Sequence, residues 1–220
     1  MNLELVWRSE QDVRLAAAIW RAGPAWRMIS SALMGGGVGT ASWVLNAQVP
    51  SDYSRLDPVA HLQELTGRFG LSGPGVGMLT AASVDRLVTR ADEGVEVTAT
   101  VGLRVPTWAA APPDGTDPEL APVRVGTINL IVAVPVALSD AALVNAVITA
   151  TEAKTQAMLE AGYPGTGTAS DAICVAARTS GRAEPFAGSR STWGARIARA
   201  AHAAVHAGAL DYTEWLRRRL

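Results

Sequence analysis

The first half of the chain is a series of short apolar runs separated by Gly, Pro, Ser and Asp. Runs of this kind, with apolar and polar residues in alternation, are typical of β-strands. They predict strands at residues 3–7, 12–20, 28–30, 40–49, 76–82, 85–90 and 95–103. Asp92, Glu93 and Gly94 separate the last two runs and predict a hairpin turn.

The second half shows the helical period more clearly. Apolar residues recur three and four positions apart in residues 140–161 and 193–210, and also in residues 58–69 of the first half. Ser139 precedes one of these helices as a cap, and Asp57 with Pro58 opens another. Residues 127–136 and 171–178 are apolar runs that predict buried strands.

This order of elements predicts an α+β fold. Mixed, largely antiparallel β-sheets would pack with about three main α-helices, and a layered α/β sandwich is one such arrangement. The length of 220 residues fits a single domain over residues 1–220. Residues 106–122 lack periodicity and predict a loop, and residues 211–220 predict a solvated C-terminal tail rich in arginine.

Composition narrows the function classes. With 19 basic and 20 acidic residues the formal net charge is -1, so no basic surface points to a nucleic-acid partner. No apolar run reaches the length of a membrane span, and the N-terminus has no apolar signal segment. We therefore expect a cytoplasmic protein without a membrane partner. The single cysteine excludes a disulfide framework within the chain.

Lys154 is the only lysine among the basic residues. Lysine, unlike arginine, readily loses its proton at a buried site, so its retention is consistent with a chemical role as well as with chance. It lies on a predicted helix whose polar stripe comprises Asn145, Thr149, Glu152 and Gln156. Such a stripe is either the solvated face of the helix or, given the many small residues around it, a packed ligand-binding face.

Residues 166–171 form a loop of small residues directly before a predicted strand. Gly167 lets the backbone approach a ligand, Thr168 and Ser170 offer hydroxyl groups, and Asp171 offers a carboxylate. A plain turn is the alternative interpretation. His202 and His206 are four residues apart and would share a helix face, but no glutamate of a metalloprotease motif stands between them, so we predict no metal site. His61 is expected on the surface of its helix.

Several ordered segments resemble the adenosylcobinamide amidohydrolase family, CbiZ. The most specific are NAVITATEAKT and TGTASDA, and others are MISSALMGGGVGTASWVLNAQVPSDY, LSGPGVGMLTAASV and ATVGLRVPTWA. The similarity spans roughly residues 25–208. The resemblance implies hydrolysis of the amide that joins a propionyl side chain of the corrin ring to aminopropanol. The products would be adenosylcobyric acid and the amino alcohol, in corrinoid salvage for cobalamin synthesis.

Amide hydrolysis needs an activated nucleophile, a stabilised oxyanion and a proton for the leaving amine. The candidate catalytic residues are Glu152 or Asp171 as a base for water, Thr168 as an alternative nucleophile, and Lys154 as an acid, a base or a cation near the oxyanion. Candidate substrate-binding residues lie in the same segments, and they are Asn46, Gln48, Asn129, Asn145, Thr155, Gly167 and Ser170.

We expect no cofactor, because the corrinoid is the substrate. Two other functions stay open at this point: a non-catalytic corrinoid-binding protein, and an amidohydrolase acting on a different amide. The oligomeric state is open as well, a homo-oligomer included.

Overall fold

A computed structural model describes residues 1–111 and 126–219. The first sheet has the strand order β1-β2-β5-β6. β2 is antiparallel to both β1 and β5, whereas β6 is parallel to β5. Its strands are β1 (Leu3–Glu10), β2 (Val13–Arg21), β5 (Trp43–Gln48) and β6 (Val76–Thr80).

The second sheet has six strands in the order β4-β3-β10-β9-β8-β7. Only β9 and β10 are parallel, with Ala172 opposite Asn129. Its strands are β3 (Trp26–Ser30), β4 (Gly37–Thr40), β7 (Val88–Asp92), β8 (Val95–Gly102), β9 (Thr127–Val134) and β10 (Ala172–Arg178). The predicted hairpin is confirmed, because Asp92 pairs with Val95 across a turn in which Glu93 and Gly94 have positive φ.

The three predicted helices are present as α1 (Pro58–Arg68), α2 (Asp140–Glu160) and α3 (Thr192–Arg217). The Ser139 side chain accepts a hydrogen bond from the Ala142 N–H and so caps α2, as predicted. Asp57 precedes α1 but makes no side-chain cap bond. Its carboxylate instead accepts hydrogen bonds from Arg55.

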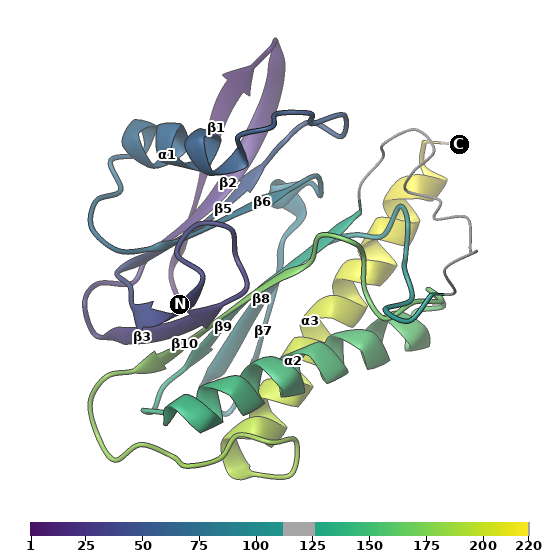
Figure 1. The fold of residues 1–220 in the computed structure, drawn as a ribbon. Helices are drawn as coiled ribbons and strands as arrows, with labels where there is room; N and C mark the ends of the chain where they lie inside the picture. Colours follow the sequence, from purple (N-terminus) through teal and green to yellow (C-terminus); the bar gives the residue numbers. More distant parts are fainter. Residues whose placement is uncertain (112–125, 220) are drawn as a thin grey trace.

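The elements stack in four layers (Figure 1): α1, the first sheet, the second sheet, and then α2 with α3. Every residue of β9 is buried. Both faces of the strand are covered, because successive side chains point to opposite sides. Leu130 and Val132 face α2 and α3, while Ile131 and Ala133 face the first sheet. The α+β prediction is confirmed, and the arrangement is the layered sandwich.

Two local predictions differ from the structure. α3 continues to Arg217, so most of the predicted tail is helical, because Tyr212 packs onto the core that the helix already covers. Residues 85–90 are not one strand, since a short 3₁₀ helix (η1, Val84–Arg86) precedes β7. Most of the predicted loop at 106–122 lies outside the described residues.

Candidate active site

A cleft of about 470 Å³ opens between the two sheets at the edge where β5 and β6 end and β9 and β10 begin. Residues 49–51 and 77–81 form the wall on the first sheet, and residues 169–172 with Thr127 form the wall on the second. Most of the lining residues are apolar. Asp171 is the only carboxylate among the described residues that line this cleft.

Lys154 and Asp171 form a buried ion pair at this edge. Lys154 Nζ contacts Asp171 Oδ2, and the two side chains are only 6% and 11% exposed. Lys154 comes from the inward face of α2, whereas Asp171 is the residue before β10. The pair therefore joins the helix layer to the loop that lines the cleft.

Asp171 is held by more than the lysine. Its Oδ1 atom accepts from the Ile128 N–H at 2.8 Å and from Thr168 Oγ1 at 2.6 Å, and its Oδ2 atom accepts from the Thr168 N–H at 3.1 Å. With Lys154, these donors occupy about all four acceptor positions of a carboxylate. The side chain is thus fixed in one orientation at the entrance of β10.

Gly167 makes this arrangement possible. A Cβ at this position would collide with Lys154 Nζ and Asp171 Oδ2, so only glycine lets the loop lie against the ion pair. Thr155, next to Lys154 on α2, donates to the Thr166 carbonyl at 2.9 Å. The predicted loop 166–171 is therefore bound to α2 on both sides of Gly167.

Ser170 is an exposed residue of the cleft wall beside Asp171. Its Oγ atom lies 2.9 Å from Thr127 Oγ1 and 3.1 Å from the Gly126 carbonyl oxygen. Thr168 is buried and does not line the cleft, and its hydroxyl lies within 2.7 Å of the same carbonyl. Of the two hydroxyl residues, Ser170 is thus the one that a substrate can reach.

The structure brings together Lys154, Thr155, Gly167, Thr168, Ser170 and Asp171, but it places two other predicted residues in the interior. Asn46 and Asn129 are 2% and 1% exposed. Asn129 Nδ2 donates to Asn46 Oδ1 at 2.8 Å, and Asn46 Nδ2 donates to Thr100 Oγ1 at 3.0 Å. Their amide groups tie the two sheets together instead of facing a ligand, because buried polar groups need partners within the protein.

Glu152, Asn145 and Gln48 also lie away from the ion pair. Glu152 is two positions before Lys154, which puts the two side chains on nearly opposite faces of α2, and it lines an exposed groove against α3. Asn145 is roughly 13 Å from Lys154 along the helix axis. Gln48 lines a neighbouring pocket, where its Oε1 atom accepts from the Val84 N–H at 3.4 Å.

Tyr53 and His61 form a chain of polar contacts that sequence reasoning missed. Tyr53 lines the cleft, and its hydroxyl lies 3.0 Å from His61 Nδ1. His61 is 3% exposed, not on the surface as expected, and its Nε2 atom lies 3.2 Å from Glu10 Oε1. Arg8 Nε donates to the same oxygen at 2.5 Å. The sequence did hold one signal for Tyr53. The segment MISSALMGGGVGTASWVLNAQVPSDY, which resembles the family, ends in Tyr53 and also contains the candidate residues Asn46 and Gln48.

Burial and hydrogen bonds together set the charge states of Tyr53 and Glu10. Burial raises the pKa of Tyr53, so the side chain is a neutral phenol near pH 7. Burial alone would also raise the pKa of Glu10, but the hydrogen bonds from Arg8 and His61 outweigh it, and the net pKa lies below its ordinary value. Glu10 is therefore a carboxylate that holds His61 in place.

The two helical histidines have a structural partner. His202 and His206 stack with ring centroids 5.7 Å apart, and His202 Nε2 lies 2.7 Å from Glu160 Oε2. Within the described ranges no three His, Cys, Asp or Glu side chains gather as a metal site would require.

None of the helices described is both long and apolar enough to cross a bilayer.

Comparisons with known proteins agree on one family. The model of the family described as adenosylcobinamide amidohydrolase matches residues 3–217. An adenosylcobinamide amidohydrolase from Methanosarcina mazei is 30% identical over 184 residues, covering 80% of this chain and 86% of the relative. One from Halobacterium salinarum is 34% identical over 193 residues, covering 84% and 81%.

Among solved structures, a protein of Pyrococcus horikoshii OT3 aligns over 96% of this chain and 83% of its own, with a TM-score of 0.46 and 12% identity. A likeness this weak does not establish a shared fold. The family match is of another order, because it covers nearly the whole chain and includes both segments that meet at the Lys154–Asp171 pair. The chain therefore belongs to the adenosylcobinamide amidohydrolase family, CbiZ, a family of amide-bond hydrolases, as the sequence resemblance predicted.

Proposed function

We propose that this protein hydrolyses the aminopropanol amide of adenosylcobinamide to give adenosylcobyric acid and aminopropanol, in corrinoid salvage. Family membership supports the substrate. One structural observation supports the location of the chemistry, namely the Asp171 carboxylate, which opens onto the cleft between the sheets while Lys154 anchors it from behind. The mainly apolar walls suit a large, flat ring with one polar arm.

Asp171 is the proposed base. Thr168 has a single hydroxyl proton but two acceptors within reach, Asp171 Oδ1 at 2.6 Å and the Gly126 carbonyl at 2.7 Å. When the hydroxyl turns to Gly126, the carboxylate accepts one hydrogen bond fewer and is a stronger base for an attacking water on the side that faces the cleft. The water oxygen then bonds to the amide carbon, and the carbonyl electrons move onto its oxygen.

Ser170 is the proposed donor to that oxyanion, because the residue is exposed beside Asp171 in the cleft and its hydroxyl can turn from the Gly126 carbonyl to the substrate. Lys154 does not reach the cleft surface. It balances the carboxylate charge and holds Asp171 in position, which makes it a positioning residue. This assignment replaces the base role that the sequence left open for Glu152.

Tyr53 is the proposed acid for the leaving amine. When His61 carries both ring protons, Nε2 donates to Glu10 and Nδ1 donates to the Tyr53 oxygen. The Tyr53 O–H is then free to protonate the amine nitrogen as the C–N bond breaks. Water afterwards returns a proton to Tyr53 and removes the one that Asp171 accepted. In this proposal protein side chains and water carry the proton transfers, and the cobalt remains part of the substrate.

The experiment is to incubate the purified protein with adenosylcobinamide and to measure adenosylcobyric acid by mass spectrometry. Asp171→Asn should lower kcat by about 10²–10⁴-fold, the range for loss of a general base. Tyr53→Phe should lower kcat less and alter the alkaline limb of the pH profile. Corrinoid binding, followed by visible absorbance, should persist in both.

Matched controls are Glu152→Gln, on the exposed face of α2, and Tyr163→Phe, whose hydroxyl contacts Thr213 outside the cleft. Both should keep wild-type turnover. Corrinoid binding without any product would instead identify a non-catalytic binding protein. Turnover by Asp171→Asn at the wild-type rate would move the base to another residue.

A further inference from the structure

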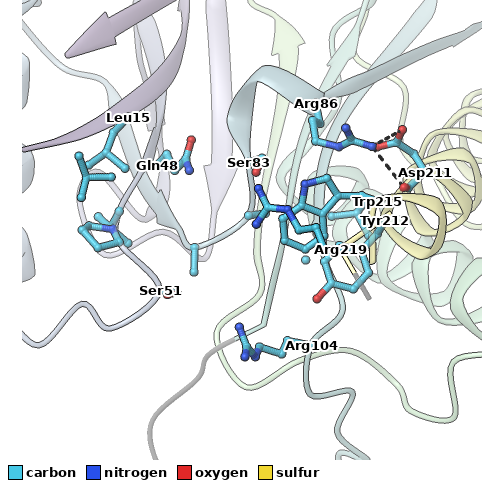
Figure 2. A pocket seen from close by; sticks show the side chains of 18 of the residues that line it. Leu15, Gln48, Ser51, Ser83, Arg86, Arg104, Asp211, Tyr212, Trp215 and Arg219 are labelled. Carbon is cyan, nitrogen blue, oxygen red and sulfur yellow. Dashed lines mark hydrogen bonds and ion pairs between the residues drawn. The ribbon is translucent and has the colours of Figure 1, made fainter. Parts of the chain in front are cut away.

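A second pocket, of about 420 Å³, adjoins the amide cleft. Figure 2 shows side chains that line it. The two share residues 49–51 and Ala81 as a common wall. The far side of the second pocket comes from the last turns of α3, with Asp211, Tyr212 and Trp215. One extended molecule can therefore occupy both spaces across the segment that follows β5.

The α3 side of this pocket offers stacked aromatic surface. Tyr212 and Trp215 have ring centroids 5.7 Å apart and planes inclined by 26°. The Arg219 guanidinium lies over the Trp215 ring at 4.1 Å from the centroid. A guanidinium is planar, so a flat, nitrogen-rich group already covers this ring, and a ligand ring would stack on Trp215 by replacing the Arg219 side chain.

The polar groups of the pocket are nearly balanced in charge. Arg86 Nη2 donates to Asp211 Oδ1 at 2.7 Å, and Figure 2 marks this ion pair with a dashed line. The other charged residues of the pocket are Arg104, Arg219 and Asp52. Gln48, Ser51 and Ser83 add neutral donors and acceptors. A pocket built to bind a phosphate would carry a larger positive excess. Stacking surface with balanced hydrogen-bonding groups fits a neutral heteroaromatic ring that carries sugar hydroxyls.

We infer that this pocket binds a purine nucleoside group and, resting on the proposed function, that the group is the adenosyl ligand on the upper face of the corrinoid cobalt. The shared wall at residues 49–51 lies between the adenosyl group in one space and the scissile amide in the other. Trp215 and Arg104 thus determine which axial form of the corrinoid is hydrolysed, while Asp171 acts on every form.

The test compares kcat/KM for adenosylcobinamide and methylcobinamide, which share the amide but differ in the axial ligand. The wild type should prefer the adenosyl form by about tenfold or more, since a base that stacks on an aromatic side chain strengthens binding. Trp215→Ala should reduce kcat/KM for the adenosyl form by about tenfold and leave the methyl form unchanged. Turnover of the methyl form also shows that the variant is folded.

Equal kcat/KM for the two forms in the wild type would overturn the assignment, as would an equal loss for both in Trp215→Ala. Arg104→Ala gives a second test, because it should lower the preference for the adenosyl form without changing any residue of α3. If the wild type hydrolyses neither form, the proposed function fails. Calorimetry with 5′-deoxyadenosine then tests the pocket alone: binding that Trp215→Ala removes supports it, and no binding overturns it.

Discussion

Lys154 Nζ and Asp171 Oδ2 form an ion pair between α2 and the entrance of β10, 17 positions apart in the chain. Both side chains are close to fully buried. Removing one member of such a pair lowers the free energy of unfolding, because the remaining buried charge keeps its desolvation penalty without the attraction of its partner.

Lys154→Met should therefore lower the free energy of unfolding by about 3–5 kcal/mol, as expected when one partner of a buried pair is removed. Urea denaturation measures it. The control is Arg21→Met, since Arg21 pairs with Glu4 at 3.5 Å while both side chains are more than half exposed, and its loss should cost under about 1 kcal/mol. A Lys154→Met loss of under about 1 kcal/mol would contradict the structural role of the pair.

Gly167→Ala should lower both turnover and stability, because the new Cβ would collide with Lys154 Nζ and Asp171 Oδ2. We expect a loss of about 1–3 kcal/mol, typical of added volume in a packed site, together with a drop in kcat. The matched control is Gly67→Ala in α1, where a Cβ meets nothing within 4 Å. That change should stabilise the helix by about 0.5–1 kcal/mol. Unchanged kcat in Gly167→Ala would show that the loop tolerates displacement.

Glu10→Gln should make the free energy of unfolding less dependent on pH in the acidic range. The folded pKa of Glu10 lies below its ordinary value of 4.5, so its contribution is fully present above that pH and is lost as the pH falls through the folded pKa. Near pH 7 the variant should be less stable than the wild type by about 1 kcal/mol, from weaker hydrogen bonds to Arg8 and His61.

The measurement is urea denaturation at a series of pH values between about 7 and 3, and the difference between the two proteins should shrink as the pH falls. Glu214→Gln, in an exposed pair with Arg218, serves as the control and should show little difference at any pH. A difference in the free energy of unfolding that grows as the pH falls would contradict the stabilising role of the Glu10 carboxylate.

Cys174 should resist alkylation in the folded protein. The residue is fully buried, and burial raises the pKa of its thiol to about 12, so almost no thiolate forms near pH 8. Mass spectrometry after iodoacetamide treatment should find the native protein unmodified and the urea-unfolded protein fully modified. Labelling of the native protein at the rate of a free thiol would show that β10 opens readily.

The sequence by itself determined most of the elements and part of the site. The helical period and the capping residue Ser139 predicted α2 correctly. The small residues of loop 166–171 and the single lysine indicated the side chains that meet in the ion pair. These signals are local, because they depend on spacing along one helix or on composition within one loop.

The tertiary structure alone decided which faces of the elements meet. Asn46 and Asn129 lie on strands of different sheets, and only the stacking of the sheets makes them partners and removes them from the cleft. Glu152 shares a helix with Lys154, but the packing of α3 puts it in a different groove. Tyr53, His61 and Glu10 come from three separate segments. Strand order and layer order are set by long-range packing, which the period of a single segment does not encode.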